Sequence, residues 1–174
     1  MVQDASFITT DPGHAKADKP RGEEALTRRS KDGTWVKKSG KPFFGFKLHM
    51  KAGTDHGLIR CLEATPASVH DNRVYLSLPG EAVYRDKGYQ GAVPRGWNAS
   101  MRRGARDHSL NIWDRLRNAR INRKRALGER SFAVIKRVFG SGHVLVTTVE
   151  RVQVKMVFAC LCLNLVQLGR LCAL

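Results

Sequence analysis

Three acidic residues occupy positions from which they could hold metal ions together. Asp4 precedes a short apolar stretch at residues 5–9, Asp86 ends another at residues 81–86, and Glu129 lies in a long basic stretch with a helical pattern. If the two apolar stretches are neighbouring strands, both aspartates face the same edge of a sheet. Converging carboxylates form a hard-oxygen site that suits Mg²⁺ and accepts substrate phosphates as further ligands. Taken alone, Asp86 could equally be a surface aspartate at the end of a strand.

Four polar residues around Glu129 share one face of the expected helix. They are spaced 0, 3, 7 and 14 along the chain: Asn122, Arg125, Glu129 and Lys136. At about 100° per residue they fall within an arc of about 60°. Arginine and lysine bind phosphate oxygens, so this face could hold a nucleic acid beside a metal ligand. The same spacing fits a solvated helix with incidental ion pairs, and the spacing alone does not decide between the two.

The chain is strongly basic. Its 174 residues carry 31 lysines and arginines against 15 aspartates and glutamates, a formal net charge of +16. Such a surface attracts polyanions, so nucleic acid is the first partner to expect. Six histidines without metal-ligand spacing argue against a zinc site, and four cysteines without a Cys-x-x-Cys pair are expected to be reduced thiols. The first residues lack the pattern of a secretion signal, which favours a cytoplasmic protein.

The strands that would position the carboxylates are marked by alternating apolar patterns. Residues 43–53 and 58–68 are predicted to form a hairpin, and further strands are predicted at 81–86 and 98–102. Residues 11–42 are polar and contain several prolines and glycines, which predicts a loop insertion after the first strand.

Helices are predicted at three places: residues 68–78, 109–139 and 149–171. The first begins with Ser68 and Asp71 at the spacing of a capping box, which also explains the neighbouring His70 without a catalytic role. The apolar run at 156–168 is short for a membrane span of about 20 residues, so we expect a buried helix there. Strands and helices in this order predict a single α/β domain over the whole chain, with a mixed sheet.

Several motifs resemble those of bacterial insertion-sequence DDE transposases. The stripe around Glu129 is similar to the family's signature N/Y-x-x-R-x-x-x-E-x-x-x-x-x-x-K around its catalytic glutamate. YRDKGYQG at 84–91 resembles the segment that carries the second aspartate, and QDASFI at 3–8 resembles the segment that carries the first. FFGFKLHM at 43–50 and EATPASVHDN at 63–72 look like the family's central strands and following helix. The resemblance covers nearly the whole chain.

This resemblance implies an RNase H-like catalytic core, a mixed sheet flanked by helices. Asp4, Asp86 and Glu129 would bind two divalent ions, Mg²⁺ or Mn²⁺. The ions would activate water to cut DNA at the ends of a mobile element, and then a 3′-hydroxyl to join those ends to target DNA. The family further implies a homodimer or larger assembly on DNA, no membrane partner, and a place in the cytoplasm at the nucleoid.

The resemblance also implies DNA contacts. Arg125 and Lys136 would bind phosphates near the cut, and Asn122 would contact the flanking backbone or a base. Lys87 and Tyr89, next to the second aspartate, would position the strand. Two further cations beside this stripe are expected to contact DNA: Arg123 and Lys124.

Two features depart from the family's pattern. The chain begins three residues before Asp4, so we expect the N-terminal region with which relatives recognise element ends to be absent. Gly128 stands where relatives more often have an apolar residue, although glycine inside a helix costs about 1 kcal/mol relative to alanine. These departures favour a truncated or split-frame transposase. They leave open an RNase H-like nuclease without strand transfer, and a non-enzymatic basic DNA-binding fragment that modulates a full-length transposase.

Overall fold

The computed structural model describes residues 1–13, 30–106 and 108–173. Its strands are β1 (Val2–Thr10), β2 (Thr34–Lys38), β3 (Lys41–Ala52), β4 (Ile59–Pro66), β5 (Ala82–Arg85), β6 (Trp97–Ser100) and β7 (His143–Val144). Its helices are α1 (Ile112–Arg137) and α2 (Val149–Cys172), and single 3₁₀ turns span Asp71–Arg73 and Lys87–Tyr89. The predicted α/β class is confirmed, and so are the strands at 43–53, 58–68, 81–86 and 98–102 and the two long helices.

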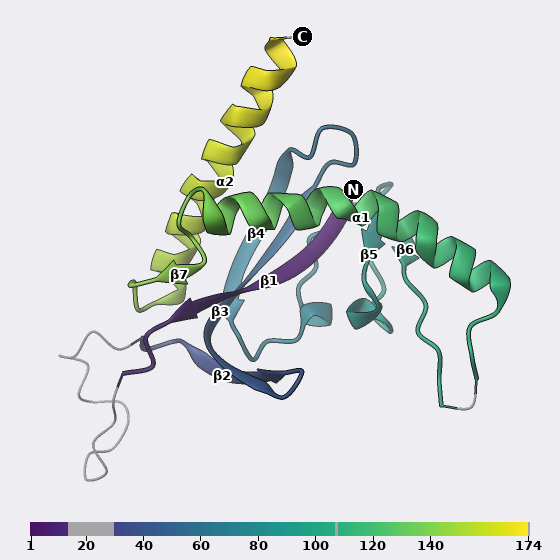
Figure 1. The fold of residues 1–174 in the computed structure, drawn as a ribbon, viewed down its shortest axis with the longest axis horizontal. Helices are drawn as coiled ribbons and strands as arrows, with labels where there is room; N and C mark the ends of the chain where they lie inside the picture. Colours follow the sequence, from purple (N-terminus) through teal and green to yellow (C-terminus); the bar gives the residue numbers. More distant parts are fainter. Residues whose placement is uncertain (14–29, 107, 174) are drawn as a thin grey trace.

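The strands form one mixed sheet (Figure 1). Its main path runs β4, β3, β1, β5, β6. The pairs β4–β3 and β3–β1 are antiparallel, whereas β5 runs parallel to β1 and β6 runs parallel to β5. The short strands β2 and β7 pair with β3 and β1. Val2 of β1 pairs with Tyr84 of β5, so the first residues of β1 lie beside the last residues of β5.

One face of the sheet is covered by both long helices. Successive side chains of a strand point to opposite faces, and on β3 every second residue is large and apolar. Phe46, Leu48 and Met50 pack in one cluster with Ile135 of α1 and Met156 of α2, all of them buried. This cluster is the main core, and it holds α1 across β1, where the chemistry-bearing residues lie (Figure 1).

The other face of β3 is polar and is covered by the irregular segment between β4 and β5. Three consecutive residues on this face are buried: Lys47, His49 and Lys51. Lys47 Nζ lies 2.8 Å from Asp71 Oδ1, and Lys51 Nζ lies 2.8 Å from Glu81 Oε2. Each buried ammonium therefore has an acidic partner, which a charge in the interior requires.

No helix forms at residues 68–78, so that prediction was wrong. The segment contains one 3₁₀ turn, Asp71–Arg73, which is capped by His70 and not by the predicted capping box. A lysine side chain on β3 donates to the Val69 carbonyl at 2.7 Å, and a glutamine side chain on β1 donates to the Val74 carbonyl at 2.8 Å. Because the sheet binds these backbone groups, the segment covers the polar face as an irregular chain.

The predicted loop at 11–42 is only partly a loop. Residues 14–29 lie outside the described part of the chain. Beyond them, β2 forms a hairpin with the start of β3. The turn uses Ser39 and Gly40 with φ values of 50° and 78°, a left-handed conformation that glycine adopts without strain.

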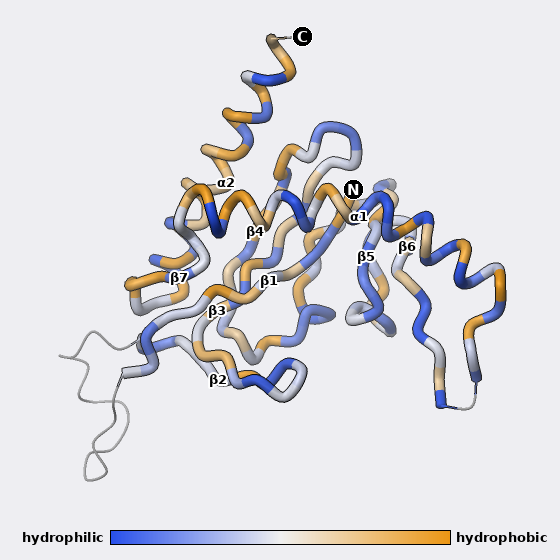
Figure 2. Tube along the Cα trace, viewed as in Figure 1, coloured by the Kyte–Doolittle hydropathy of each residue, from blue (hydrophilic) through white to orange (hydrophobic). Residues whose placement is uncertain are grey.

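The apolar run at 156–168 predicted a buried helix, but α2 is buried along one side only. Only one stripe of the helix packs on the sheet, and its last turns project away from the rest of the protein (Figure 2). By length and composition α2 could cross a membrane, with a mean hydropathy of 1.6, but a core helix passes the same test. The opposite stripe is apolar and exposed.

Candidate active site

Strands β1 and β5 bring the two predicted aspartates together. Val2 pairs with Tyr84 in parallel register, and Asp4 and Asp86 each follow two residues later. The Asp86 carboxylate accepts a hydrogen bond from the Lys87 backbone N–H at 2.6 Å, so it caps the following 3₁₀ turn. This cap fixes the point at which the chain leaves the sheet, directly beside Asp4.

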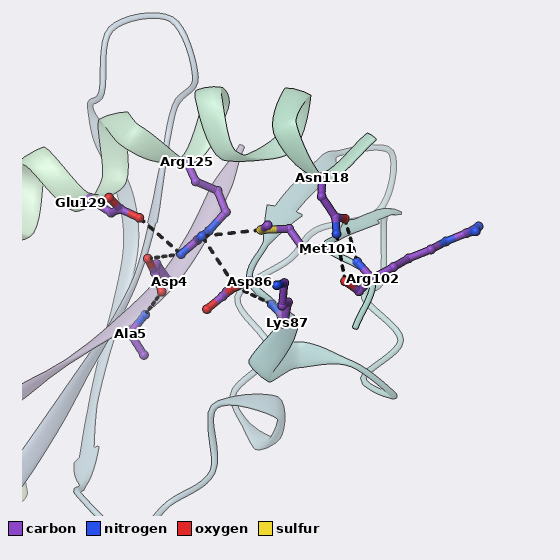
Figure 3. Close-up of polar contacts among 9 residues, drawn as sticks. All are labelled: Asp4, Ala5, Asp86, Lys87, Met101, Arg102, Asn118, Arg125 and Glu129. Carbon is purple, nitrogen blue, oxygen red and sulfur yellow. Dashed lines mark hydrogen bonds and ion pairs between the residues drawn. The ribbon is translucent and has the colours of Figure 1, made fainter. Parts of the chain in front are cut away.

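Glu129 is positioned by the close approach of α1 to β1. A Cβ atom on Gly128 would lie 3.0 Å from Val2 Cγ1, closer than such atoms normally come. The glycine therefore allows α1 to lie against the first residues of β1. The next residue of the helix, Glu129, then points toward Asp4 (Figure 3). The glycine that departs from the family's pattern is thus the residue that permits this packing.

Arg125 lies at the centre of the three carboxylates (Figure 3). Its Nη2 donates to Asp4 Oδ2 at 2.8 Å, and its guanidinium lies 3.8 Å from Asp86 Oδ1 and 3.8 Å from Glu129 Oε1. Its side chain is only 7% exposed, against 48% for Asp86 and 59% for Glu129. A residue predicted to bind DNA is therefore the buried counter-charge of the acidic cluster.

The charge on Asp4 depends on this arrangement. Burial of the carboxyl raises its pKa above the usual value, and the nearby carboxylate of Asp86 adds a smaller contribution in the same direction. The Arg125 guanidinium opposes both and favours the ionised form. A cation beside Asp4 thus favours the ionised form of its carboxyl.

The three carboxylates fit a divalent cation in donor type and in charge. In the described part of the chain, no three acidic, histidine or cysteine side chains are placed to hold a metal ion as they stand. The oxygens instead surround one guanidinium, which shows that the site stabilises positive charge at this point. Two of the three carboxylates, Asp86 and Glu129, are half-exposed, so their side chains have room to turn.

The other members of the predicted stripe lie at the edges of this site. Asn122 is exposed one turn before Arg125. Lys136 lies two turns after Glu129 and is half-buried, and burial together with the charge of Lys38 lowers its pKa. Asn122 is therefore open to a ligand, whereas Lys136 lies near the charge of Lys38 on β2.

The two residues that were predicted to position DNA beside Asp86 differ in their exposure to solvent. Lys87 is exposed, directly next to the acidic cluster. Tyr89 is buried, with 1% of its surface exposed, and its ring packs under the Arg85 guanidinium at 5.3 Å. A DNA contact by Tyr89 does not fit this position, because the ring reaches no surface.

Arg123 and Lys124 do not join the carboxylates. They line a separate cleft of about 730 Å³ between the first half of α1 and strands β5 and β6. Trp113, Arg117 and Arg120 line the same cleft. The sequence pattern had signalled the positive charge of this helix but not that it divides between two surfaces.

Two residues that hold the site together were missed by the sequence analysis. The side chain of Asn118 both donates to and accepts from the backbone of Arg102, at 2.9 Å each. The sulfur of Met101, in the same segment, lies 3.8 Å from Arg125 Nη1. Asn118 continues the polar stripe one turn toward the start of α1, a signal that could have found it; Met101 has no such signal.

A basic α/β domain with carboxylates gathered around one cation belongs to a class suited to metal-assisted chemistry on a polyanion. Comparison with known proteins gives the family. The transposase DDE domain family matches residues 2–165. The chain belongs to this family, which confirms the resemblance of its motifs.

A curated relative supports the same assignment. A transposase for insertion sequence element IS1106 from Neisseria meningitidis serogroup B is 28% identical over 151 residues, which cover 80% of this chain and 52% of the relative. The chain thus spans about half the length of that relative. No solved structure matches the chain.

Proposed function

We propose that the chain is the catalytic domain of a DNA transposase that cuts DNA at element ends and joins it to a target. The observation that carries this proposal is the meeting of Asp4, Asp86 and Glu129 around one buried cation. The strand path β4, β3, β1, β5, β6, antiparallel in its first part and parallel in its second, supports an RNase H-like core formed by a single domain.

The three carboxylates would hold divalent ions, Mg²⁺ or Mn²⁺, at this point. Such ions, when bound, would supply an activated water or 3′-hydroxyl and would stabilise the leaving oxygen at phosphorus. Asp4 would act as the fixed ligand, since it is the most buried of the three and its strand is paired on both sides. Asp86 and Glu129 would adjust to the ions from the exposed side.

The cations around the site would hold the DNA backbone. Arg125 would bind a phosphate beside the carboxylates, since its planar guanidinium can bind two phosphate oxygens. Lys87 and Asn122 are exposed on either side of it and would contact the flanking strand. Arg123, Lys124 and Lys136 would bind DNA farther from the cut. Cleavage and joining would take place at the nucleoid in the cytoplasm.

Cleavage and joining can be tested with the purified chain, Mg²⁺ and a duplex that carries an element end. We expect nicks at the end and joined products with a target plasmid, and the loss of both in Asp86→Asn. The control is Asp55→Asn, which removes an exposed acid from the turn between β3 and β4. Equal activity of Asp86→Asn and the wild type would overturn the assignment of the site.

A second candidate function is a DNA-binding fragment that modulates a full-length transposase. It is favoured by one observation, that the chain spans about half of its relative. In that case the wild type and Asp86→Asn would bind DNA alike and neither would cut it. Nicks without joined products would instead identify a nuclease that lacks strand transfer.

A further inference from the structure

The Arg125 guanidinium has more hydrogen-bond donors than it has acceptors among the described residues (Figure 3). A guanidinium carries five N–H groups and keeps its charge in a protein. Nη2 donates to Asp4 Oδ2 at 2.8 Å, and Nη1 has the Met101 sulfur as a weak acceptor at 3.8 Å. Nε is buried and has no hydrogen-bond partner in the described part of the chain. Because buried donors are normally paired, hydrogen bonding alone does not explain why this side chain is buried here.

Charge explains the position of Arg125. Asp4, Asp86 and Glu129 bring three negative charges when they are ionised, and the guanidinium supplies one positive charge. The cluster is left with two negative charges in excess, which one divalent ion neutralises. A second divalent ion would instead leave two positive charges in excess, beside a guanidinium that is only 7% exposed. Charge without a counter-charge is costly away from water.

The geometry distinguishes the most buried carboxylate from the other two. Both oxygens of Asp4 are already bonded, since Oδ1 accepts from the Ala5 backbone N–H at 2.9 Å and Oδ2 accepts from Arg125 at 2.8 Å. Asp86 and Glu129 lie 3.8 Å from the guanidinium, beyond hydrogen-bond distance, and about half of each side chain is exposed. One ion can therefore reach these two carboxylates from the solvent side while Arg125 stays on Asp4. An ion that also needs Asp4 Oδ2 must displace the guanidinium.

We propose that, in the absence of DNA, this site takes one divalent ion and that the Arg125 guanidinium occupies the place of a second. The inference rests on the proposed function, in which the three carboxylates hold the ions. A phosphate of bound DNA would supply the negative charge that a second ion requires. Its oxygens would also accept from the unpaired N–H groups, because a planar guanidinium suits phosphate. Binding of the second ion then depends on DNA.

The ions can be counted without any measurement of catalysis. The whole chain is freed of nucleic acid with nuclease and high salt and is titrated with Mn²⁺, and the free Mn²⁺ is measured by electron paramagnetic resonance. Ions held elsewhere on the chain are subtracted with the double variant Asp86→Asn/Glu129→Gln. We expect one ion per wild-type chain. Arg125→Gln should bind two over the same range of free Mn²⁺ concentrations, because the competing cation is gone.

Three further variants separate the charge of Arg125 from its volume and from the charge of the whole protein. Arg125→Met fills similar space without charge and should also bind two ions, so the test does not depend on one neutral variant. Arg125→Lys keeps the positive charge and should bind one. Arg120→Gln removes an exposed cation of the same helix and should bind one as well. Circular dichroism in the presence of Mn²⁺ shows which variants are folded.

The counts decide the proposal. Two ions in the wild type would overturn it, as would none, and so would one ion in the folded neutral variants or two in Arg125→Lys. The test of catalysis is separate. Cleavage and joining by a chain that binds two ions without DNA would contradict this inference alone, whereas the expected counts without any cleavage would contradict the proposed function alone.

Discussion

Arg125 on α1 donates a hydrogen bond of 2.8 Å to Asp4 on β1, although 121 positions of sequence separate them. The pair joins the helix to the strand at the point where two further carboxylates approach. The positive charge in the middle of the cluster is thus supplied by the chain itself. Any divalent ion that binds there must share these carboxylates with a resident guanidinium.

The removal of this charge should destabilise the metal-free protein. Arg125→Gln leaves Asp4 buried beside Asp86 without a cation, and we expect the free energy of unfolding to fall by about 3 kcal/mol. Urea denaturation in EDTA measures this loss. Addition of Mg²⁺ should restore more stability to Arg125→Gln than to the wild type, because the ion no longer competes with a guanidinium.

Arg120→Gln is the control for that experiment, since Arg120 is an exposed arginine of the same helix. Its stability should stay within about 0.5 kcal/mol of the wild type. Equal stability of the Arg125 and Arg120 variants in EDTA would contradict the role of Arg125 as counter-charge.

Gly128 should resist substitution by alanine although alanine is the better helix former. The added Cβ would lie 3.0 Å from Val2 Cγ1, so the Val2 side chain, which packs between α1 and β1, must give way. We expect Gly128→Ala to lower stability by about 1–2 kcal/mol, as overpacking does. Gly169→Ala in α2, where no atom lies within 4 Å of the new Cβ, should instead raise it by up to about 1 kcal/mol. The additional change Val2→Ala should relieve the effect of Gly128→Ala; if it does not, the contact is not the cause.

His49 should make the fold sensitive to acid. Burial lowers the pKa of its imidazole from 6.5 to about 4, and its Nε2 lies 2.9 Å from the Thr65 hydroxyl. The unfolded chain takes up a proton near pH 6.5 but the folded chain does not. The contribution of neutral His49 to the free energy of unfolding is therefore complete above pH 6.5 and is lost as the pH falls toward 4. The loss is on the order of 3 kcal/mol.

Urea denaturation at pH 7 and pH 4.5 measures this effect, and His49→Gln should reduce the difference between the free energies of unfolding at the two pH values. The exposed His56 is the control, and His56→Gln should leave the pH dependence as in the wild type. An NMR titration that gives His49 a pKa near 6 would contradict the prediction.

Substitutions of Lys87 and Tyr89 should differ in their effects on DNA affinity. Lys87→Ala removes an exposed cation and should weaken binding several-fold, with a salt slope reduced by about one. Tyr89→Phe removes a buried hydroxyl that has no hydrogen-bond partner in the described part of the chain, so it should leave affinity unchanged and stability equal or higher. Fluorescence anisotropy at several salt concentrations checks both; weaker binding by Tyr89→Phe would show that the ring reaches the DNA.

The long elements could be predicted from the sequence because each repeats one pattern over many residues. Alternation along β3 and the helical spacing in α1 predicted these elements, whereas the meeting of Asp4, Asp86 and Glu129 was predicted from the resemblance to a family and on the condition that their two strands are neighbours. The segment at 68–78 could not be predicted, since its backbone groups are bound by Lys47 and by a glutamine of β1 that are distant in sequence.

The orientation of individual side chains was also beyond the sequence. Spacing put Arg125 on the correct face of its helix but could not show that the guanidinium turns inward to Asp4. Tyr89 stands in a polar segment, and its burial depends on the 3₁₀ turn that Asp86 caps and on the Arg85 side chain. Both depend on contacts between elements, which spacing within one element does not contain.

Helix α1 carries the cleft residue Trp113 near one end and the ligand candidate Glu129 sixteen residues later, without a break. Because the helix is unbroken, the sixteen residues from Trp113 to Glu129 correspond to a fixed length of about 24 Å along its axis. A duplex aligned with α1 would therefore meet Trp113 and the carboxylates about seven base pairs apart, since its steps are about 3.4 Å. Footprinting would measure the distance between the DNA protected near Trp113 and the cut. The length of one helix would then set this distance.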